Sequence, residues 1–154
     1  MKFQMAAIAL IATCISPLAL AKDPVAVDVP LDAATRSALP RHKVEASAHD
    51  QALYCEGVEL AALLRKVGAM PADPLRGKEF AHYVRVEESD GYRAVFSLAE
   101  LDATLGNAKV CLEDRCGGKP LDDKNGPLRL IAPEEARPAR WVRQVQSIRV
   151  VDAA

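Results

Sequence analysis

Apolar and polar residues alternate along much of the chain after Pro24, and this alternation predicts half-buried β-strands. The segments with this pattern are residues 25–29, 42–48, 83–86, 92–96, 109–115, 128–132 and 141–151. Asp90 and Gly91 separate two of these segments and form a dipeptide that favours a two-residue hairpin turn. We therefore expect a β-hairpin over residues 83–96.

Helical spacing occurs in shorter stretches. The segment 57–67 opens with a glycine, has apolar residues at helical intervals, and is followed by Gly68 at the position of a C-terminal cap. Ser97 and Glu100 form a capping-box pattern, which predicts a short helix through Leu105.

These elements follow one another without a regular alternation, so we expect an α+β protein whose sheet is mixed or largely antiparallel. The chain has 154 residues, and 50% of them are hydrophobic, which is enough for one core and too little for two domains. Its 20 basic and 21 acidic residues leave no excess of positive charge, so we expect no nucleic-acid partner.

Residues 1–21 have the composition of a signal peptide. Lys2 precedes an apolar stretch, and the sequence Ala-Leu-Ala ends at Ala21. The stretch is short and interrupted, whereas a bilayer-spanning helix takes about 20 continuous apolar residues. We predict cleavage after Ala21, a single mature domain of residues 22–154 that is not embedded in a membrane, and a periplasmic or secreted location.

Three cysteines remain in the mature chain, so at most one intramolecular disulfide can form. Cys111 and Cys116 are five residues apart in a predicted strand, which separates their Cα atoms by about 16 Å if the strand is extended. They can pair only if the chain bends at Arg115, and the pairing among Cys55, Cys111 and Cys116 stays open. Neither a Cys-x-x-Cys pair nor a histidine pair at helical spacing occurs, so no zinc site is expected.

The segment 125–143 has the composition of a binding site. Arg129, Arg137, Arg140 and Arg143 surround Trp141. Guanidinium groups bind planar anions with two hydrogen bonds, and an indole offers a face for stacking, so these residues suit a phosphate-bearing or heteroaromatic ligand. The alternative is that the arginines lie on a half-exposed strand and Trp141 belongs to the core.

Several short motifs, in their order and spacing, resemble the molybdopterin-binding domain of the sulfite oxidase family, and above all its short exported single-domain members. The motifs are Gly57-Val58-Glu59-Leu60 with Leu63-Leu64 and Gly68, Asp90-Gly91-Tyr92, Ser97-Leu98-Ala99-Glu100-Leu101, Gly118-Lys119-Pro120-Leu121, Gly126-Pro127-Leu128-Arg129-Leu130, Pro133 and Arg140-Trp141-Val142. The resemblance spans most of the mature chain and implies a sulfite oxidase-type fold.

The resemblance also implies a pterin or molybdopterin pocket. Arg129 and Arg140 match two basic positions that the family's enzymes use in that pocket, although the second is a lysine there. Asn125 lies near a position where an enzyme can carry histidine, and Trp141 or Tyr92 would stack on the ligand. We therefore expect the Arg129 and Arg140 side chains to converge on one cavity.

The chain departs from the family at the metal ligand. The enzymes bind molybdenum through a cysteine well upstream of the motif that begins at Gly57, but residues 44–50 contain no cysteine. Cys55 lies only two residues before Gly57, so we interpret it as a small packing residue or a spare thiol, and we do not expect bound molybdenum. Cys111 is a core candidate, and Cys116 is expected at a turn.

These observations favour an exported, non-catalytic protein that binds a pterin-like molecule. The resemblance implies that such a protein acts on a partner, such as a membrane sensor of cyclic diguanylate signalling or a redox protein. One alternative is a minimal molybdenum oxidoreductase with Cys55 as the metal ligand. Another is a pure protein-interaction module whose pocket is closed by Trp141, Phe96 and Arg140.

Overall fold

The structure is a computed structural model that describes residues 26–153. The predicted signal peptide, residues 1–21, lies outside the described residues. Within the described part, no helix is long and apolar enough to cross a membrane.

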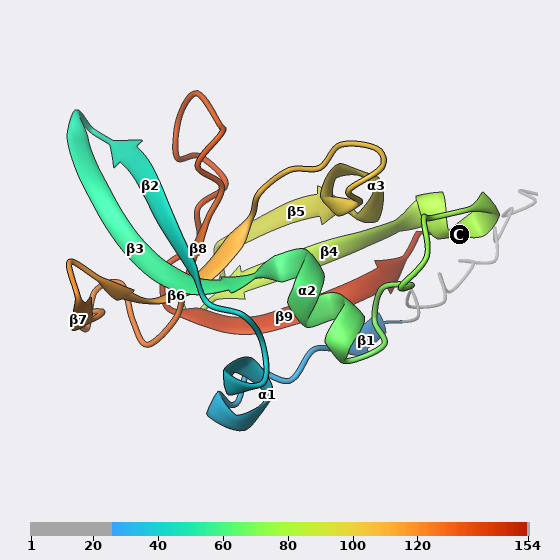
Figure 1. Cartoon of the computed structure of the whole chain (residues 1–154), viewed down its shortest axis with the longest axis horizontal. Helices are drawn as coiled ribbons and strands as arrows, with labels where there is room; N and C mark the ends of the chain where they lie inside the picture. The colour runs from blue at the N-terminus through green and yellow to red at the C-terminus, as the bar shows by residue number, and fades with distance from the viewer. Residues whose placement is uncertain (1–25, 154) are drawn as a thin grey trace, which may run out of the picture.

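The described chain forms one small α+β domain with two sheets (Figure 1). The first sheet has the order β1 (Ala26–Asp28), β9 (Val145–Asp152), β4 (His82–Glu88), β5 (Arg93–Ser97). The second has the order β2 (His42–Ala48), β3 (Gln51–Glu59), β6 (Cys111–Cys116), β7 (Lys119–Pro120), and β8 (Arg129–Ile131) also pairs with β6. All strand pairs between residues 26 and 153 are antiparallel, which confirms the predicted α+β class with a largely antiparallel arrangement.

Short helices complete the domain. They are α1 (Ala33–Ser37), α2 (Leu60–Lys66), the 3-10 helix η1 (Gly77–Ala81) and α3 (Leu98–Leu101). Helix α2 buries an apolar face made by Leu60, Ala61, Leu63 and Leu64, which belong to the same core as Val84 and Val86 of β4. This core fixes the strands whose ends carry the pocket described below.

The helix expected over residues 57–67 begins later than its pattern predicts. Gly57 belongs to β3, next to a register shift against β6, and helix α2 begins only at Leu60. A Cβ atom at position 57 would lie 2.0 Å from the carbonyl oxygen of Leu112. The glycine therefore allows two strands to approach closely and does not open a helix.

The sequence pattern assigned no element to residues 51–56, which form most of β3. The β2–β3 turn is made by His49 and Asp50, both with positive φ angles of 51° and 62°. Such turns are usually marked by Asn or Gly, so this one lacked its sequence signal. Figure 1 shows the β2–β3 hairpin projecting beside the loop that follows β8.

The predicted hairpin and capping box are confirmed. Strands β4 and β5 pair antiparallel, and Gly91 in the turn has a φ of 91°. The Ser97 hydroxyl accepts a hydrogen bond from the Glu100 backbone N–H, and the Glu100 carboxylate accepts one from the Ser97 N–H. Helix α3 ends at Leu101 and not at Leu105, because the next residue has an extended backbone.

The last predicted strand, residues 141–151, is interrupted. Val142 forms an isolated bridge with Leu130, Gln144 has a φ of 43°, and β9 begins at Val145. Because the backbone over residues 141–144 is irregular, these side chains do not point alternately to opposite faces, as they would in a continuous strand.

A disulfide joins Cys55 of β3 to Cys116 of β6. The interpretation of Cys55 as a spare thiol is therefore wrong, whereas its side chain is buried in the core as a packing residue would be. The two residues are partners in the β3–β6 register, which brings them together across 61 positions of sequence. Cys111 is the free cysteine among the described residues and is buried in the core, as predicted.

Candidate functional site

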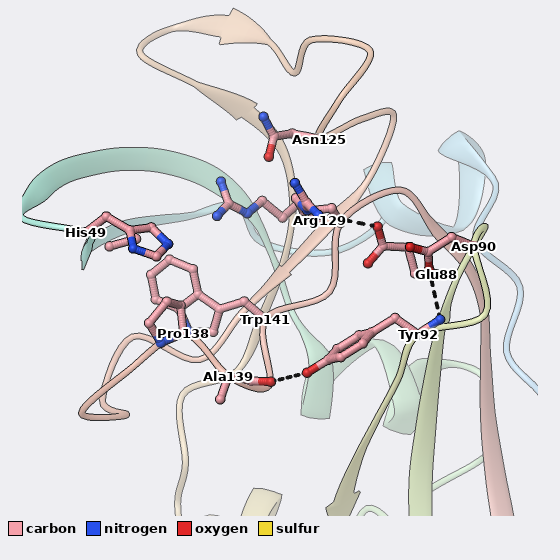
Figure 2. A pocket seen from close by; sticks show the side chains of 11 residues that line it. His49, Glu88, Asp90, Tyr92, Asn125, Arg129, Pro138, Ala139 and Trp141 are labelled. Carbon is pink, nitrogen blue, oxygen red and sulfur yellow. Dashed lines mark hydrogen bonds and ion pairs between the residues drawn. The ribbon is translucent and has the colours of Figure 1, made fainter.

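A pocket of about 420 Å³ lies where the β4–β5 turn, the β2–β3 turn and two segments flanking β8 meet (Figure 2). Its lining combines basic, acidic and aromatic side chains. The lining residues are Ala48, His49, Glu88, Asp90, Tyr92, Asn125, Arg129, Pro138, Ala139, Trp141 and Arg143. Four of the five predicted site residues, Arg129, Trp141, Tyr92 and Asn125, are thus brought together.

Arg129 is the half-buried cation of this pocket, which the more exposed Arg143 also lines. It lies on β8, and its guanidinium carbon is 5.4 Å from the centroid of the Trp141 ring. Its Nε is buried and has no hydrogen-bond partner, and no carboxylate of residues 26–153 forms an ion pair with it. Burial, and then the nearby Arg143, lower the pKa of the Arg129 guanidinium. A half-buried cation that no carboxylate contacts in an ion pair can attract an anionic ligand, because such a ligand supplies the missing direct partner.

Trp141 positions Arg129. The indole is buried, and its Nε1 donates a 2.9 Å hydrogen bond to the carbonyl oxygen of Ala132. Because the ring is buried and in contact with the guanidinium, it offers the ligand little free surface. The Trp141 side chain belongs to the core, which was the alternative to a ligand-stacking role. Its outer surface also lines the pocket.

Tyr92 is the exposed aromatic residue of the pocket, with 46% of its surface accessible. Its hydroxyl donates a hydrogen bond to the carbonyl oxygen of Ala139, which links the β4–β5 turn to the segment before Trp141 (Figure 2). The hydrogen bond fixes the ring at the pocket wall, so the ring is available for stacking without further ordering.

Asn125 lines the pocket but has part of its bonding capacity occupied. Its Nδ2 donates a 2.8 Å hydrogen bond to Asp122 Oδ1, and its backbone carbonyl accepts one from the Gln144 N–H at 3.0 Å. The hydrogen bond from the Asn125 side chain lowers the pKa of the Asp122 carboxyl. The side-chain amide oxygen of Asn125 remains as the acceptor that it can offer a ligand.

Arg140 does not line this pocket, so the predicted convergence of Arg129 and Arg140 is wrong. The Arg140 guanidinium pairs with Glu135 at 2.5 Å and with Glu100 at 3.1 Å, and its carbon lies 4.3 Å from the Phe96 ring centroid. The space beside it is about 100 Å³. Arg140 and Trp141 are neighbours in sequence but project to different sides of the irregular segment, and two carboxylates already neutralise Arg140.

Glu88 and His49 also line the pocket and are not among the predicted site residues. Glu88 follows Val84 and Val86 at intervals of two on β4, so the strand alternation alone places it on the buried face. It is 7% exposed, and its Oε1 lies 3.9 Å from Nη2 of Arg143. His49 lies in a turn that lacks the usual Asn or Gly. No pattern in the sequence indicates that it lines the pocket.

The donor set does not fit molybdenum. Cys55 is bonded to Cys116 and offers no thiolate, which is the ligand that the minimal oxidoreductase would require. Burial raises the pKa of the Cys111 thiol to about 12, so that sulfur stays protonated. Among residues 26–153, no group of three or more His, Cys, Asp or Glu side chains could hold a metal ion. The residues around Arg129 do fit the organic part of such a cofactor, because they combine a cation, an exposed aromatic ring and hydrogen-bonding groups.

Comparison with known proteins leaves the resemblance to the sulfite oxidase family as a proposal. No protein-family model matches the chain, and no curated protein matches its sequence. The function therefore has to be inferred from the pocket and its chemistry.

Proposed function

We propose that this protein is an exported, non-catalytic binding protein for a planar, pterin-like molecule that carries an anionic group, on a sulfite oxidase-type fold. The observation that carries the proposal is the unpaired, half-buried Arg129 guanidinium in a pocket that also presents the Tyr92 ring. Arg129 would bind the anionic group, and Tyr92 would stack on the heterocycle.

The pocket also gives the bound ligand a route to a partner. His49 and residues 138–139 line both this pocket and a second hollow of about 620 Å³ between the β2–β3 turn and the loop after β8. A ligand that contacts both loops would hold them in one arrangement, and a partner that recognises this arrangement would respond to the loaded protein. By the resemblance, we propose a membrane sensor or a redox protein as that partner.

The pocket separates this proposal from the closed interaction module. On the Arg140 side, the structure is indeed closed, because Phe96 is fully buried beneath the Arg140 guanidinium. The pocket at Arg129 is a different one and holds about 420 Å³, which lies within the range of small-molecule sites. The geometry therefore favours a ligand-binding role over a purely structural one.

The test is a titration of the mature protein with pterin-6-carboxylate, followed by fluorescence or calorimetry. We expect Arg129→Met to weaken binding roughly tenfold or more, because a hydrogen bond between charged groups is lost. Arg140→Met is the matched control, because it removes an arginine that faces a different part of the molecule.

Two outcomes would overturn the proposal. One is that the wild-type protein does not bind the carboxylate at millimolar concentration. The other is that Arg140→Met weakens binding as much as Arg129→Met while thermal denaturation shows both variants folded.

A further inference from the structure

Glu88 is a largely buried residue whose carboxylate lies at the pocket wall beside Arg143. It ends β4, at a register shift between Glu87 and Glu88 in the pairing with β9. Val84 and Val86 precede it on the same strand face and lie in the core. In Figure 2, the dashed line at the Glu88 carboxylate is its ion pair with Arg143.

The carboxylate of Glu88 has acceptor capacity that no hydrogen bond within the described part of the chain uses. No hydrogen bond to its side-chain oxygens is present in the described part of the chain, and its ion pair with Arg143 is 3.9 Å long. The Arg143 side chain is 55% exposed, so water weakens that pair further. The Glu88 oxygens, at the wall of the pocket, are therefore available to accept hydrogen bonds from a ligand.

We propose that Glu88 is a specificity-determining residue that selects ligands with two adjacent N–H donors on one ring edge. This inference rests on the proposed function. A carboxylate accepts two parallel hydrogen bonds from such an edge, as it does from a guanidinium. The 2-amino-4-oxopyrimidine ring of a pterin offers this edge through its 2-amino group and its N3–H. A ligand would then place its donor edge at Glu88 and its anionic group at Arg129.

The arrangement also disfavours two simpler ligands. Inorganic phosphate would be attracted by Arg129 but repelled by the Glu88 carboxylate in the same pocket. A heterocycle with a carbonyl at position 2 would place its oxygen, a hydrogen-bond acceptor, against the Glu88 carboxylate, which is also an acceptor. Binding would then lose more free energy than the removal of one hydrogen bond, because the two oxygens repel each other and neither has a donor.

The experiment compares two ligands that differ only at this edge, pterin-6-carboxylate and lumazine-6-carboxylate, which has an oxo group at position 2. We expect the wild-type protein to prefer the pterin about tenfold or more. In Glu88→Gln the preference should shrink, mainly through weaker pterin binding. Glu87→Gln is the matched control, because Glu87 pairs with Arg93 at 2.9 Å and does not line the pocket.

The outcomes separate this inference from the proposed function. If neither ligand binds the wild-type protein, both fail. If pterin-6-carboxylate binds in an Arg129-dependent manner but the wild-type protein does not distinguish the two ligands, the role of Glu88 alone is wrong. A preference that survives unchanged in a folded Glu88→Gln protein would also overturn it.

Discussion

At the scale of single residues, Glu113 is the most unusual group outside the pocket. It lies on β6 with no exposed surface, and neither of its carboxylate oxygens has a hydrogen-bond partner. Burial, reinforced by the nearby Asp114, raises the pKa of the Glu113 carboxyl to about 8. Arg129 is its partner in the β6–β8 register, so the site's cation and this carboxyl lie on neighbouring strands.

The raised pKa of Glu113 predicts a pH-dependent stability. The folded protein binds a proton that the unfolded chain releases above its ordinary pKa of 4.5, so the contribution of Glu113 to the unfolding free energy falls as the pH rises from about 4.5 to about 8. The slope is at most about 1.4 kcal/mol per pH unit.

Glu113→Gln should remove this slope, because glutamine does not ionise. Urea denaturation of both proteins at pH 5 and pH 8 measures it, and the variant should gain stability relative to the wild type as the pH rises. Glu87→Gln, at a surface ion pair, serves as the control. A gap between Glu113→Gln and the wild type that is the same at both pH values would contradict the prediction.

The site residues show how far the sequence can lead. Residue types indicate Arg129 and Trp141, the family resemblance adds Tyr92 and Asn125, and all four line one pocket. Glu88 could have been found from the alternation along β4. The direction of the Arg140 side chain could not have been found from the sequence, because the backbone between residues 139 and 144 is irregular. No periodic rule applies to such a segment, and the carboxylates that neutralise Arg140 come from distant positions.

At the scale of elements, Gly57 decides how β3 meets β6. Its position against the Leu112 carbonyl leaves no space for a side chain. We expect Gly57→Ala to lower the unfolding free energy by about 3 kcal/mol or more, because the backbone of one strand must move. Gly68→Ala is the matched control: position 68 has a φ of 74° and open surroundings, so its cost is the backbone term of about 1 kcal/mol.

Thermal and urea denaturation of the two glycine variants check this prediction. Equal losses of unfolding free energy in the two variants would contradict it, because they would show that the strands accommodate a side chain at position 57 without an energetic penalty. The same glycine explains why the helix was predicted three residues too early: apolar positions 58, 60 and 61 fit a helical interval, and only contact with β6 assigns residues 57–59 to a strand.

At the scale of the whole molecule, the disulfide Cys55–Cys116 ties the β2–β3 hairpin to β6. A disulfide is typical of proteins outside the cytosol and is consistent with the predicted export. The cross-link spans 61 positions, and closing a loop of that length in the unfolded chain corresponds to about 4 kcal/mol.

We expect the double variant Cys55→Ala/Cys116→Ala to lose up to about 4 kcal/mol of stability and to become insensitive to reductant. Cys111→Ala is the control, because Cys111 is free and the cross-link stays intact. Urea denaturation with and without dithiothreitol measures both effects. The prediction fails if the wild type is equally stable in reductant, or if peptide mapping of the unreduced protein finds Cys55 alkylated.

The sequence by itself determined the features that depend on local chemistry. Alternating polarity specified β4, β5 and most other strands, and the capping box specified the start of α3. Residue types indicated the arginines and the tryptophan of the pocket. The tertiary structure alone decided which cysteines pair, where β3 ends and α2 begins, and which arginine reaches the pocket. These outcomes depend on contacts between residues far apart in the chain, and a local pattern carries no record of which distant backbone or carboxylate will lie beside it.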